Sequence, residues 1–198
     1  WTPVERFAHA DGWQCGAQTT DGSFDFSFGG KPQGRAQWDL LGAHNQHNAL
    51  AAIAAARHAG VPVAASVAAL AEFKNVKRRM ETRGTVNDIT VYDDFAHHPT
   101  AIATTVAGLR RQLGNSRILA VLEPRSNTMK LGTMKNALPG SLSDADLVFG
   151  FGAKGEGKDA LGWDLGAALA PLGDKARAFD DLSLLVEAVA LAAKPGDS

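Results

Sequence analysis

The sequence is poor in cysteine, in long apolar stretches and in excess charge of either sign. Cys15 is the single cysteine among 198 residues, which excludes a disulfide within the chain and a zinc site built from several cysteines. No apolar stretch is long and uninterrupted enough to span a bilayer. The formal net charge of -1 gives no overall attraction to nucleic acid or to an anionic membrane. These absences favour a protein of the reducing cytoplasm that binds neither nucleic acid nor a membrane.

The apolar content is sufficient for a folded core. Hydrophobic residues make up 45% of the chain, and 198 residues suit one domain of ordinary size, or one domain joined to part of another. The chain begins at Trp1 with no basic-then-apolar leader, and it ends on the turn-like stretch "KPGDS". We therefore expect a fragment of a longer protein.

Periodicity divides the chain into two parts. Residues 1–40 contain short aromatic and alternating runs that predict strands, with a hairpin turn at Asp21–Gly22. Two Ala-rich helices are expected next, one between Gly42 and Gly60 and one in "PVAASVAALAEF". The basic stretch "KNVKRRMETRG" breaks this pattern, so we place a domain junction there.

Strand and helix periods alternate from the junction to the end of the chain. Strands are predicted in "NDITVYDDF", "SRILAVLEP", "ADLVFGFG" and "KARAF". Helices are predicted in "PTAIATTVAGLRRQLG", "MKLGTMKNAL", "LGWDLGAALAPLG" and "DLSLLVEAVALAAK". Alternation of this kind, with nearly continuous apolar strands, predicts an α/β fold: a Rossmann-like, mostly parallel sheet with helices on both faces.

The stretch "GFGAKGEGKD", residues 150–159, resembles two phosphate-binding patterns and satisfies neither. As a P-loop it lacks the Ser or Thr that ligates magnesium, because Asp159 follows Lys158. As a dinucleotide fingerprint it follows the third strand of the series, and its helix is delayed to about Gly162. We expect a Gly- and Lys-containing loop at a strand end; the alternative is a loop that contacts an anionic substrate through Lys154 and Lys158.

Polar side chains crowd the start of the first predicted helix, in "GAHNQHNALAA". They are His44, Asn45, His47 and Asn48. One of them could serve as an N-cap, but a cap needs only one such residue. Asparagine can also donate to and accept from the N6/N7 edge of adenine. Both interpretations, capping and adenine recognition, are open at this point.

The junction is the most basic stretch of the chain. Five of the eleven residues in 74–84 are Lys or Arg. No aromatic residues interleave these charges, which argues against nucleic-acid binding. The stretch is either a solvated charge run or the source of an arginine that grips a phosphate through two hydrogen bonds.

A third cluster, "VYDDFAHHPT", lies where a predicted strand ends and a helix begins. It contains Asp93, Asp94, His97 and His98. Open α/β sheets bind ligands at such strand ends, and helix N-termini favour anions. Asp and His at this spacing also suit a metal ion. The alternative without function is an Asp N-cap and two surface histidines.

A fourth cluster, "LEPRSNTMK", follows the next buried strand and is therefore expected at the same sheet edge. Its polar residues Arg125, Ser126, Asn127 and Lys130 are suited to holding carboxylates. The alternative is ordinary loop composition.

Taken in order, "HNQHNALAA", an Arg-rich linker and "DDFAHHPT" resemble the Mur ligases of peptidoglycan synthesis, from about Gly42 to the last residue. The motifs "VKRRMETRG", "VYDDFAHHPTAI", "LEPRSNTMKLG" and "LGWDL" are similar to one branch of this family. That branch joins UDP-N-acetylmuramate to the tripeptide L-alanyl-γ-D-glutamyl-meso-diaminopimelate in peptidoglycan (murein) recycling. The alternative branch, UDP-N-acetylmuramate–L-alanine ligase, is expected to have an aromatic-rich loop in place of "EPRSNTMK".

The resemblance implies an ATP-dependent acid–amino-acid ligase with a role in cell-wall biogenesis, cell shape and cell division. Residues 1–74 would be the tail of the central ATP-binding domain, and residues 75–198 the C-terminal domain, truncated at its end. The chain has no G-T-x-G-K-[ST] P-loop, so ATP and Mg²⁺ would be held mainly by a portion that it lacks. We therefore expect the fragment alone to be inactive.

The resemblance also implies residue roles. The catalytic residues would be Arg79, Asp94 and His97. Asn45 and Asn48 would lie near adenine, Arg79 near the ATP phosphates and Asp94 near the ribose. The tripeptide carboxylates would meet Arg125, Ser126, Asn127 and Lys130, and no metal ligand is implied.

The implied reaction passes through an acyl phosphate. ATP phosphorylates the muramate carboxylate, the peptide amine attacks, and phosphate leaves. Catalysis of this kind is mostly positioning and charge stabilisation. Two other classes stay open from the residues alone: a metal-dependent hydrolase built on Asp93, Asp94, His97 and His98, and a non-catalytic nucleotide-binding module.

Overall fold

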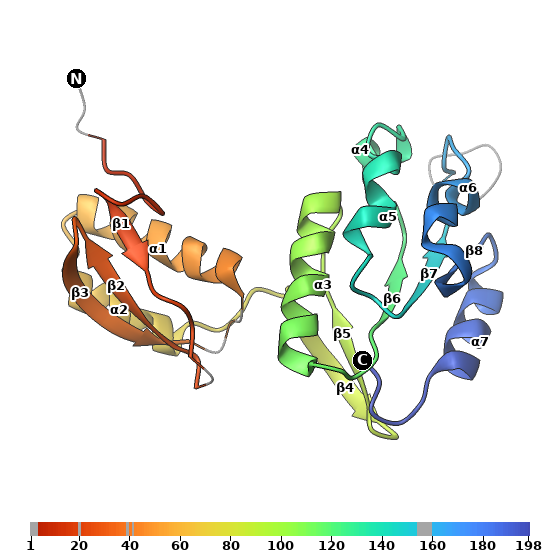
Figure 1. The fold of residues 1–198 in the computed structure, drawn as a ribbon, viewed down its shortest axis with the longest axis horizontal. Helices are drawn as coiled ribbons and strands as arrows, with labels where there is room; N and C mark the ends of the chain where they lie inside the picture. The colour runs from red at the N-terminus through yellow and green to blue at the C-terminus, as the bar shows by residue number, and fades with distance from the viewer. Residues whose placement is uncertain (1–3, 20, 39, 41, 154–159) are drawn as a thin grey trace. The chain divides into compact units, whose positions relative to one another are not determined.

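The computed structural model describes residues 4–19, 21–38, 40, 42–153 and 160–198. The chain divides into two compact units, Trp1–Asn75 and Val76–Ser198. Both can be followed in Figure 1, where the colour runs from red at the N-terminus to blue at the C-terminus. No helix in the described part of the chain is long and apolar enough to cross a membrane.

The first unit is an antiparallel sheet with two helices packed on it. Its strands lie in the order β1-β2-β3, and the bounds are β1 Trp13–Cys15, β2 Ser23–Phe28, β3 Lys31–Gln37, α1 Ala43–His58 and α2 Val63–Glu72. Phe24 and Phe26 are alternate residues of β2, so both side chains point to the same face. They are buried in one core with Trp13, Leu50 and Ile53. This core fixes α1 against the sheet.

One tight hairpin turn of this unit is Gly29–Gly30 between β2 and β3. Both glycines have positive φ, 53° and 74°, as a two-residue hairpin loop requires. The predicted hairpin turn at Asp21–Gly22 is confirmed, since the Gly22 amide donates to the Thr19 carbonyl at 3.0 Å and the Thr19 amide donates to the Ser23 carbonyl at 2.8 Å, between the antiparallel strands β1 and β2. Asp21 Oδ1 accepts a hydrogen bond from the Ser23 amide at 3.1 Å, just where β2 begins.

The second unit opens with a hairpin whose first strand the sequence analysis did not predict. β4 Glu81–Val86 pairs antiparallel with β5 Ile89–Asp93. The two residues between them, Asn87 and Asp88, have φ of 52° and 61° and make the turn. Nearly all of β4 is exposed, so its sequence lacks the apolar alternation of a half-buried strand. These residues form a strand because they pair with β5, and burial of apolar side chains contributes little.

The rest of the second unit is a parallel sheet with helices, as predicted. β6 Leu119–Leu122, β7 Leu147–Phe151 and β8 Ala176–Phe179 are neighbours in the order β6-β7-β8. The helical segments are α3 Pro99–Leu113, α4 Asn127–Lys130, η1 Lys135–Ala137, α5 Leu138–Ser141, α6 Leu165–Leu169, η2 Ala170–Lys175 and α7 Leu182–Ala192. The predicted α/β fold class is confirmed.

Helices cover both faces of the parallel sheet. Val148 of β7 is buried in one core with Ile102 of α3 and Leu169 of α6. Side chains alternate along a strand, so the next residue, Phe149, points to the opposite face. Its ring stacks on Phe179 of β8, with centroids 6.4 Å apart. α7 packs against β7 and β8 and lies across the sheet from α3 (Figure 1).

The last three residues connect the hairpin to the parallel sheet. The Thr90 amide donates to the Asp197 carbonyl at 3.1 Å, and the Ser198 amide donates to the Arg117 carbonyl at 3.0 Å. The Leu119 amide donates to the Ser198 carbonyl, so this last segment pairs with β6 in the hydrogen-bond pattern of parallel strands. The buried Asp197 carboxylate holds this segment through two bonds from Arg117, at 3.1 and 2.9 Å. β5 and β6 therefore run in the same direction, and their carboxyl ends lie at the same edge.

Two predicted helices are shorter than expected. In "LGWDLGAALAPLG" the helix begins only at Leu165, where Asp164 acts as N-cap and accepts from the Ala167 amide at 3.0 Å. In "MKLGTMKNAL" the helical path is broken at Gly132, whose φ is 72°. The apolar pattern was correct in both cases, but a cap and a left-handed glycine set the true boundaries.

Candidate functional site

Asp94 lies directly after β5, and its carboxylate accepts three hydrogen bonds within the second unit. Oδ2 accepts from the Met80 amide at 2.9 Å. Oδ1 accepts from the Ala96 amide at 2.8 Å and from Thr105 Oγ1 at 3.3 Å. The donors belong to the segment before β4, the turn before α3, and α3 itself. A carboxylate offers about four lone-pair positions, so Asp94 retains one for a ligand hydroxyl.

The residues beside Arg79 have an uncommon backbone conformation. Arg78 and Met80 have φ of 58° and 48°, although neither is glycine. Asp94 holds the Met80 amide, and Glu81 Oε2 accepts from the Arg78 amide at 2.9 Å. Such left-handed residues persist only where their surroundings fix them. The hydrogen bonds of the Arg78 and Met80 amides therefore fix the backbone turn that carries the exposed side chain of Arg79.

The four residues of the hydrolase alternative do not converge on one point. Asp93 forms an ion pair with Arg78 at 3.3 Å, and Asp94 accepts from the amides described above. His98 is engaged as a helix cap. Among the described residues, no group of three or more His, Cys, Asp or Glu is placed to hold a metal ion. The geometry does not favour a metal-dependent hydrolase.

The two neighbouring histidines have opposite hydrogen-bonding roles. His97 Nδ1 lies 2.9 Å from the Phe95 carbonyl oxygen, which can only accept, so Nδ1 donates and Nε2 is available on an exposed ring. His98 Nδ1 accepts from the Thr100 amide at 3.2 Å and is the N-cap of α3. The cap expected from an Asp is therefore supplied by His98. Of the pair, His97 is the one suited to meet a ligand.

The asparagines at the start of α1 do not serve as its cap. The N-cap is Gly42, and no side chain caps this helix. Gln46 is buried, and its Nε2 donates to the Gly16 carbonyl at 2.9 Å, which anchors the helix start on the sheet. Asn45 is half-buried and Asn48 is exposed one turn further on. Capping therefore does not explain why these asparagines are present.

The loop after β6 contains the four candidate carboxylate-binding residues. Ser126 is the N-cap of α4, and its Oγ accepts from the Met129 amide at 3.3 Å. Arg125 is exposed and lies 4.0 Å from Glu123 Oε2, which is a weak surface ion pair. Asn127 is exposed and Lys130 is half-buried. Ser126 thus has a local structural role, while Arg125 and Asn127 are accessible to a ligand.

Two residues that support Asp94 and the loop after β6 were not among the predicted site residues. Thr105 donates to Asp94 from within α3, and Trp163 Nε1 donates to the Met129 carbonyl at 2.8 Å. Trp163 lies in the motif "LGWDL", which does not indicate this contact. The only signal for Thr105 was a polar residue inside an amphipathic helix.

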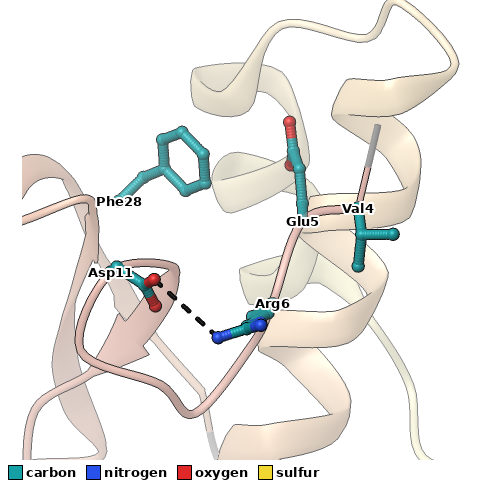
Figure 2. Close-up of a pocket in the computed structure, with 5 residues that line it drawn as sticks. All are labelled: Val4, Glu5, Arg6, Asp11 and Phe28. Atoms are coloured by element: carbon teal, nitrogen blue, oxygen red, sulfur yellow. Dashed lines mark ion pairs between the residues drawn. The ribbon is translucent and has the colours of Figure 1, made fainter. Parts of the chain in front are cut away.

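Two other features do not contribute to the site. A shallow pocket of about 410 Å³ in the first unit is lined by Val4, Glu5, Arg6, Asp11 and Phe28, with an ion pair between Arg6 and Asp11 (Figure 2). None of the predicted site residues lines it. The predicted loop role of Lys154 and Lys158 concerns residues 154–159, which lie outside the described residues.

The second unit identifies the class of protein. Residues 78–198 match the family model described as "Mur ligase, glutamate ligase domain". This match covers more than half of the chain, and the predicted family resemblance is confirmed. The chain belongs to the Mur ligase family.

Two relatives and one solved structure illustrate the similarity within this family. The chain is 44% identical over 199 residues to "UDP-N-acetylmuramate--L-alanyl-gamma-D-glutamyl-meso-2,6-diaminoheptandioate ligase" of Escherichia coli K12, covering 100% of this chain and 42% of that protein. It is 38% identical over 131 residues to "UDP-N-acetylmuramate--L-alanine ligase" of Myxococcus xanthus, covering 66% of this chain and 27% of that protein. The crystal structure of a murein peptide ligase from Psychrobacter arcticus matches with a TM-score of 0.68 at 38% identity, covering 93% of this chain and 39% of that one. The chain thus spans about two fifths of the length of the Escherichia coli and Psychrobacter arcticus proteins.

Proposed function

We propose that this chain is part of an ATP-dependent ligase that forms an amide bond between UDP-N-acetylmuramate and L-alanyl-γ-D-glutamyl-meso-diaminopimelate. The observation that carries the proposal is the 44% identity, over the whole chain, to the Escherichia coli protein that bears this name. The identity to the L-alanine ligases is lower, 38% over 66% of the chain for one and 37% over 85% for another. UDP-N-acetylmuramate–L-alanine ligase is therefore the second candidate.

The proposal assigns the two parts of the chain to two domains of such a ligase. Residues 1–74 would be the tail of the central ATP-binding domain, and residues 75–198 the C-terminal domain. The division of the chain into two compact units supports this assignment. So does the family match, which begins at residue 78.

On the nucleotide side, Asn45, Asn48, Arg79 and Asp94 would contact ATP. Asn48 is exposed and its side chain does not cap α1, so its amide group can form hydrogen bonds with the N6/N7 edge of adenine. Asp94 retains about one acceptor position, which suits a ribose hydroxyl. Arg79 would meet the phosphates from its fixed turn, where a guanidinium stabilises transferring phosphoryl charge. ATP and Mg²⁺ together supply the phosphoryl group that activates the muramate carboxylate.

On the peptide side, the loop after β6 would hold the carboxylates of the tripeptide. Arg125 and Asn127 are exposed and can donate hydrogen bonds to carboxylate oxygens. Ser126 would contribute mainly by capping α4, since its hydroxyl oxygen already accepts from Met129. Lys130 would add a positive charge at the end of the same short helix. His97, with Nε2 available, would lie near the reacting groups.

The cellular setting follows from the proposed reaction. A ligase that reuses a murein tripeptide would act in the cytoplasm, where the UDP-sugar and ATP are found. It would contribute to peptidoglycan recycling and, through it, to cell-wall biogenesis, cell shape and cell division. We propose no nucleic-acid or membrane partner.

The test is a substrate competition in the full-length ligase. Purified enzyme receives UDP-N-acetylmuramate, ATP, Mg²⁺ and equal concentrations of the tripeptide and L-alanine, and the products are separated by mass. We expect the tripeptide adduct with matching ADP release. An L-alanine adduct as the main product would favour the second candidate. ATP binding without any adduct would favour a non-catalytic nucleotide-binding module.

A further inference from the structure

Trp163 joins the segments that leave the carboxyl ends of β6 and β7. Its Nε1 donates to the Met129 carbonyl at 2.8 Å, and the same carbonyl accepts from the Gly132 amide at 3.0 Å. Trp163 directly precedes Asp164, the N-cap of α6, so its backbone position is set by the start of that helix. The end of α4 is therefore tied to α6 through one indole.

Gly132 permits the close approach of this indole. A Cβ at Gly132 would lie 2.8 Å from Trp163 Cδ1, nearer than real Cβ atoms come to such atoms, and 3.2 Å from Cγ, which is a tight contact. Its φ of 72° also disfavours any side chain. The ring consequently packs against the backbone at the end of α4.

The loop is held from its other side by the core. Met129 is 2% exposed and belongs to the main hydrophobic core of the second unit, and Trp163 packs against the same core. Three constraints thus act on the segment 126–132: the Ser126 cap, the buried Met129 side chain and the Trp163 hydrogen bond. A four-residue helix such as α4 has little stability of its own, so these contacts fix its position.

We propose that Trp163 and Gly132 are positioning residues for the peptide-binding loop. They hold residues 125–130 in one conformation before the substrate arrives, so that Arg125 and Asn127 meet the tripeptide carboxylates in a fixed geometry. This inference rests on the proposed function. Ordering a loop in advance removes that ordering cost from binding, and a misplacement of about 1 Å can reduce rate or affinity severely.

The first test replaces Trp163 by Phe, which keeps an aromatic ring and removes the N–H donor. In the full-length ligase, we expect Trp163→Phe to raise KM for the tripeptide about tenfold and to leave KM for ATP unchanged. In the 198-residue chain, amide exchange at Gly132 and Lys130 should become faster. A purely structural role would change both KM values together or neither.

The second test compares two glycine variants that both place a side chain at a position of positive φ. Gly132→Ala and Gly114→Ala both place a side chain at positive φ, 72° and 60°, but nothing lies within 4 Å of a Cβ at Gly114. We expect only Gly132→Ala to raise KM for the tripeptide. Equal effects of both variants would show that the Trp163 contact is irrelevant to binding.

The outcomes separate this inference from the proposed function. If the wild-type ligase forms no tripeptide adduct, the proposed function fails and the inference fails with it. If the wild type is active and Trp163→Phe leaves KM for the tripeptide unchanged, only the inference is overturned. If loop exchange is also unchanged in Trp163→Phe, the indole does not hold the loop at all.

Discussion

Replacing Asp94 by Asn should weaken the second unit, because the structure uses both carboxylate oxygens. Oδ1 accepts from Ala96 and Thr105, and Oδ2 accepts from Met80 at 2.9 Å. An asparagine keeps one acceptor oxygen and places an NH₂ against a donor, so at least one bond to a charged group is lost. Such a bond contributes about 1.5–3 kcal/mol, and we expect Asp94→Asn to lower the free energy of unfolding by that amount.

Asp93→Asn is the matched control. Asp93 is the preceding residue and forms an exposed ion pair with Arg78, whose side chain is 56% exposed, so its loss should cost less than about 1 kcal/mol. Urea denaturation of the 198-residue chain, followed by the methyl NMR signals of Ile102 and Ile118, reports on the second unit because both are in its core. Equal midpoints for Asp94→Asn and Asp93→Asn would refute the reasoning. In the full-length ligase, Asp94→Asn should also lower kcat/KM, whereas Asp93→Asn should change it little.

Three further predictions concern the helix cap, an acidic residue and ATP. His98→Ala should destabilise the second unit by about 1 kcal/mol and His98→Asn by less, because Asn can also cap α3; thermal unfolding of both variants checks this. Burial raises the pKa of Asp146, but the 2.8 Å bond from the Ile118 amide and the Arg110 guanidinium outweigh it, so the pKa lies below its ordinary value. Its stabilisation is therefore present above the unfolded pKa of about 4 and is lost as pH falls through the folded value, so the destabilisation by Asp146→Asn in urea titrations should be full at about pH 7 and should shrink as the pH falls below about 4. The 198-residue chain, which has no P-loop sequence, should bind ATP no more tightly than about 1 mM, and calorimetry giving micromolar affinity would contradict the assigned roles.

The sequence was sufficient for the parallel sheet because its strands are apolar and bounded by turn signals. "LVFGF" is buried or half-buried throughout and "LAVL" is half-buried except for Val121, and continuous apolar runs of this length are typical of parallel strands. β4 could not be predicted in this way. Its residues are mostly exposed and mostly polar, and only its pairing with β5 makes it a strand.

The sequence predicts those site residues that lie where a strand ends and a helix begins. Asp94 follows a strand and precedes a helix, which is where α/β sheets bind ligands. Thr105 and Trp163 were not predictable, because their partners lie 11 and 34 residues away and meet them only in the folded chain. The alternative of an Asp N-cap for α3 is wrong, because a histidine nitrogen takes the place of the usual Asp oxygen.

The most direct test of the account follows the oxygen atoms of the muramate carboxylate. UDP-N-acetylmuramate carrying ¹⁸O in that carboxylate is incubated with the full-length ligase, ATP, Mg²⁺ and the tripeptide, and the products are analysed by mass spectrometry. An acyl phosphate intermediate predicts the tripeptide adduct together with inorganic phosphate that has gained one ¹⁸O atom for each amide bond formed. Label in AMP, unlabelled phosphate, or the absence of a tripeptide adduct would contradict the account.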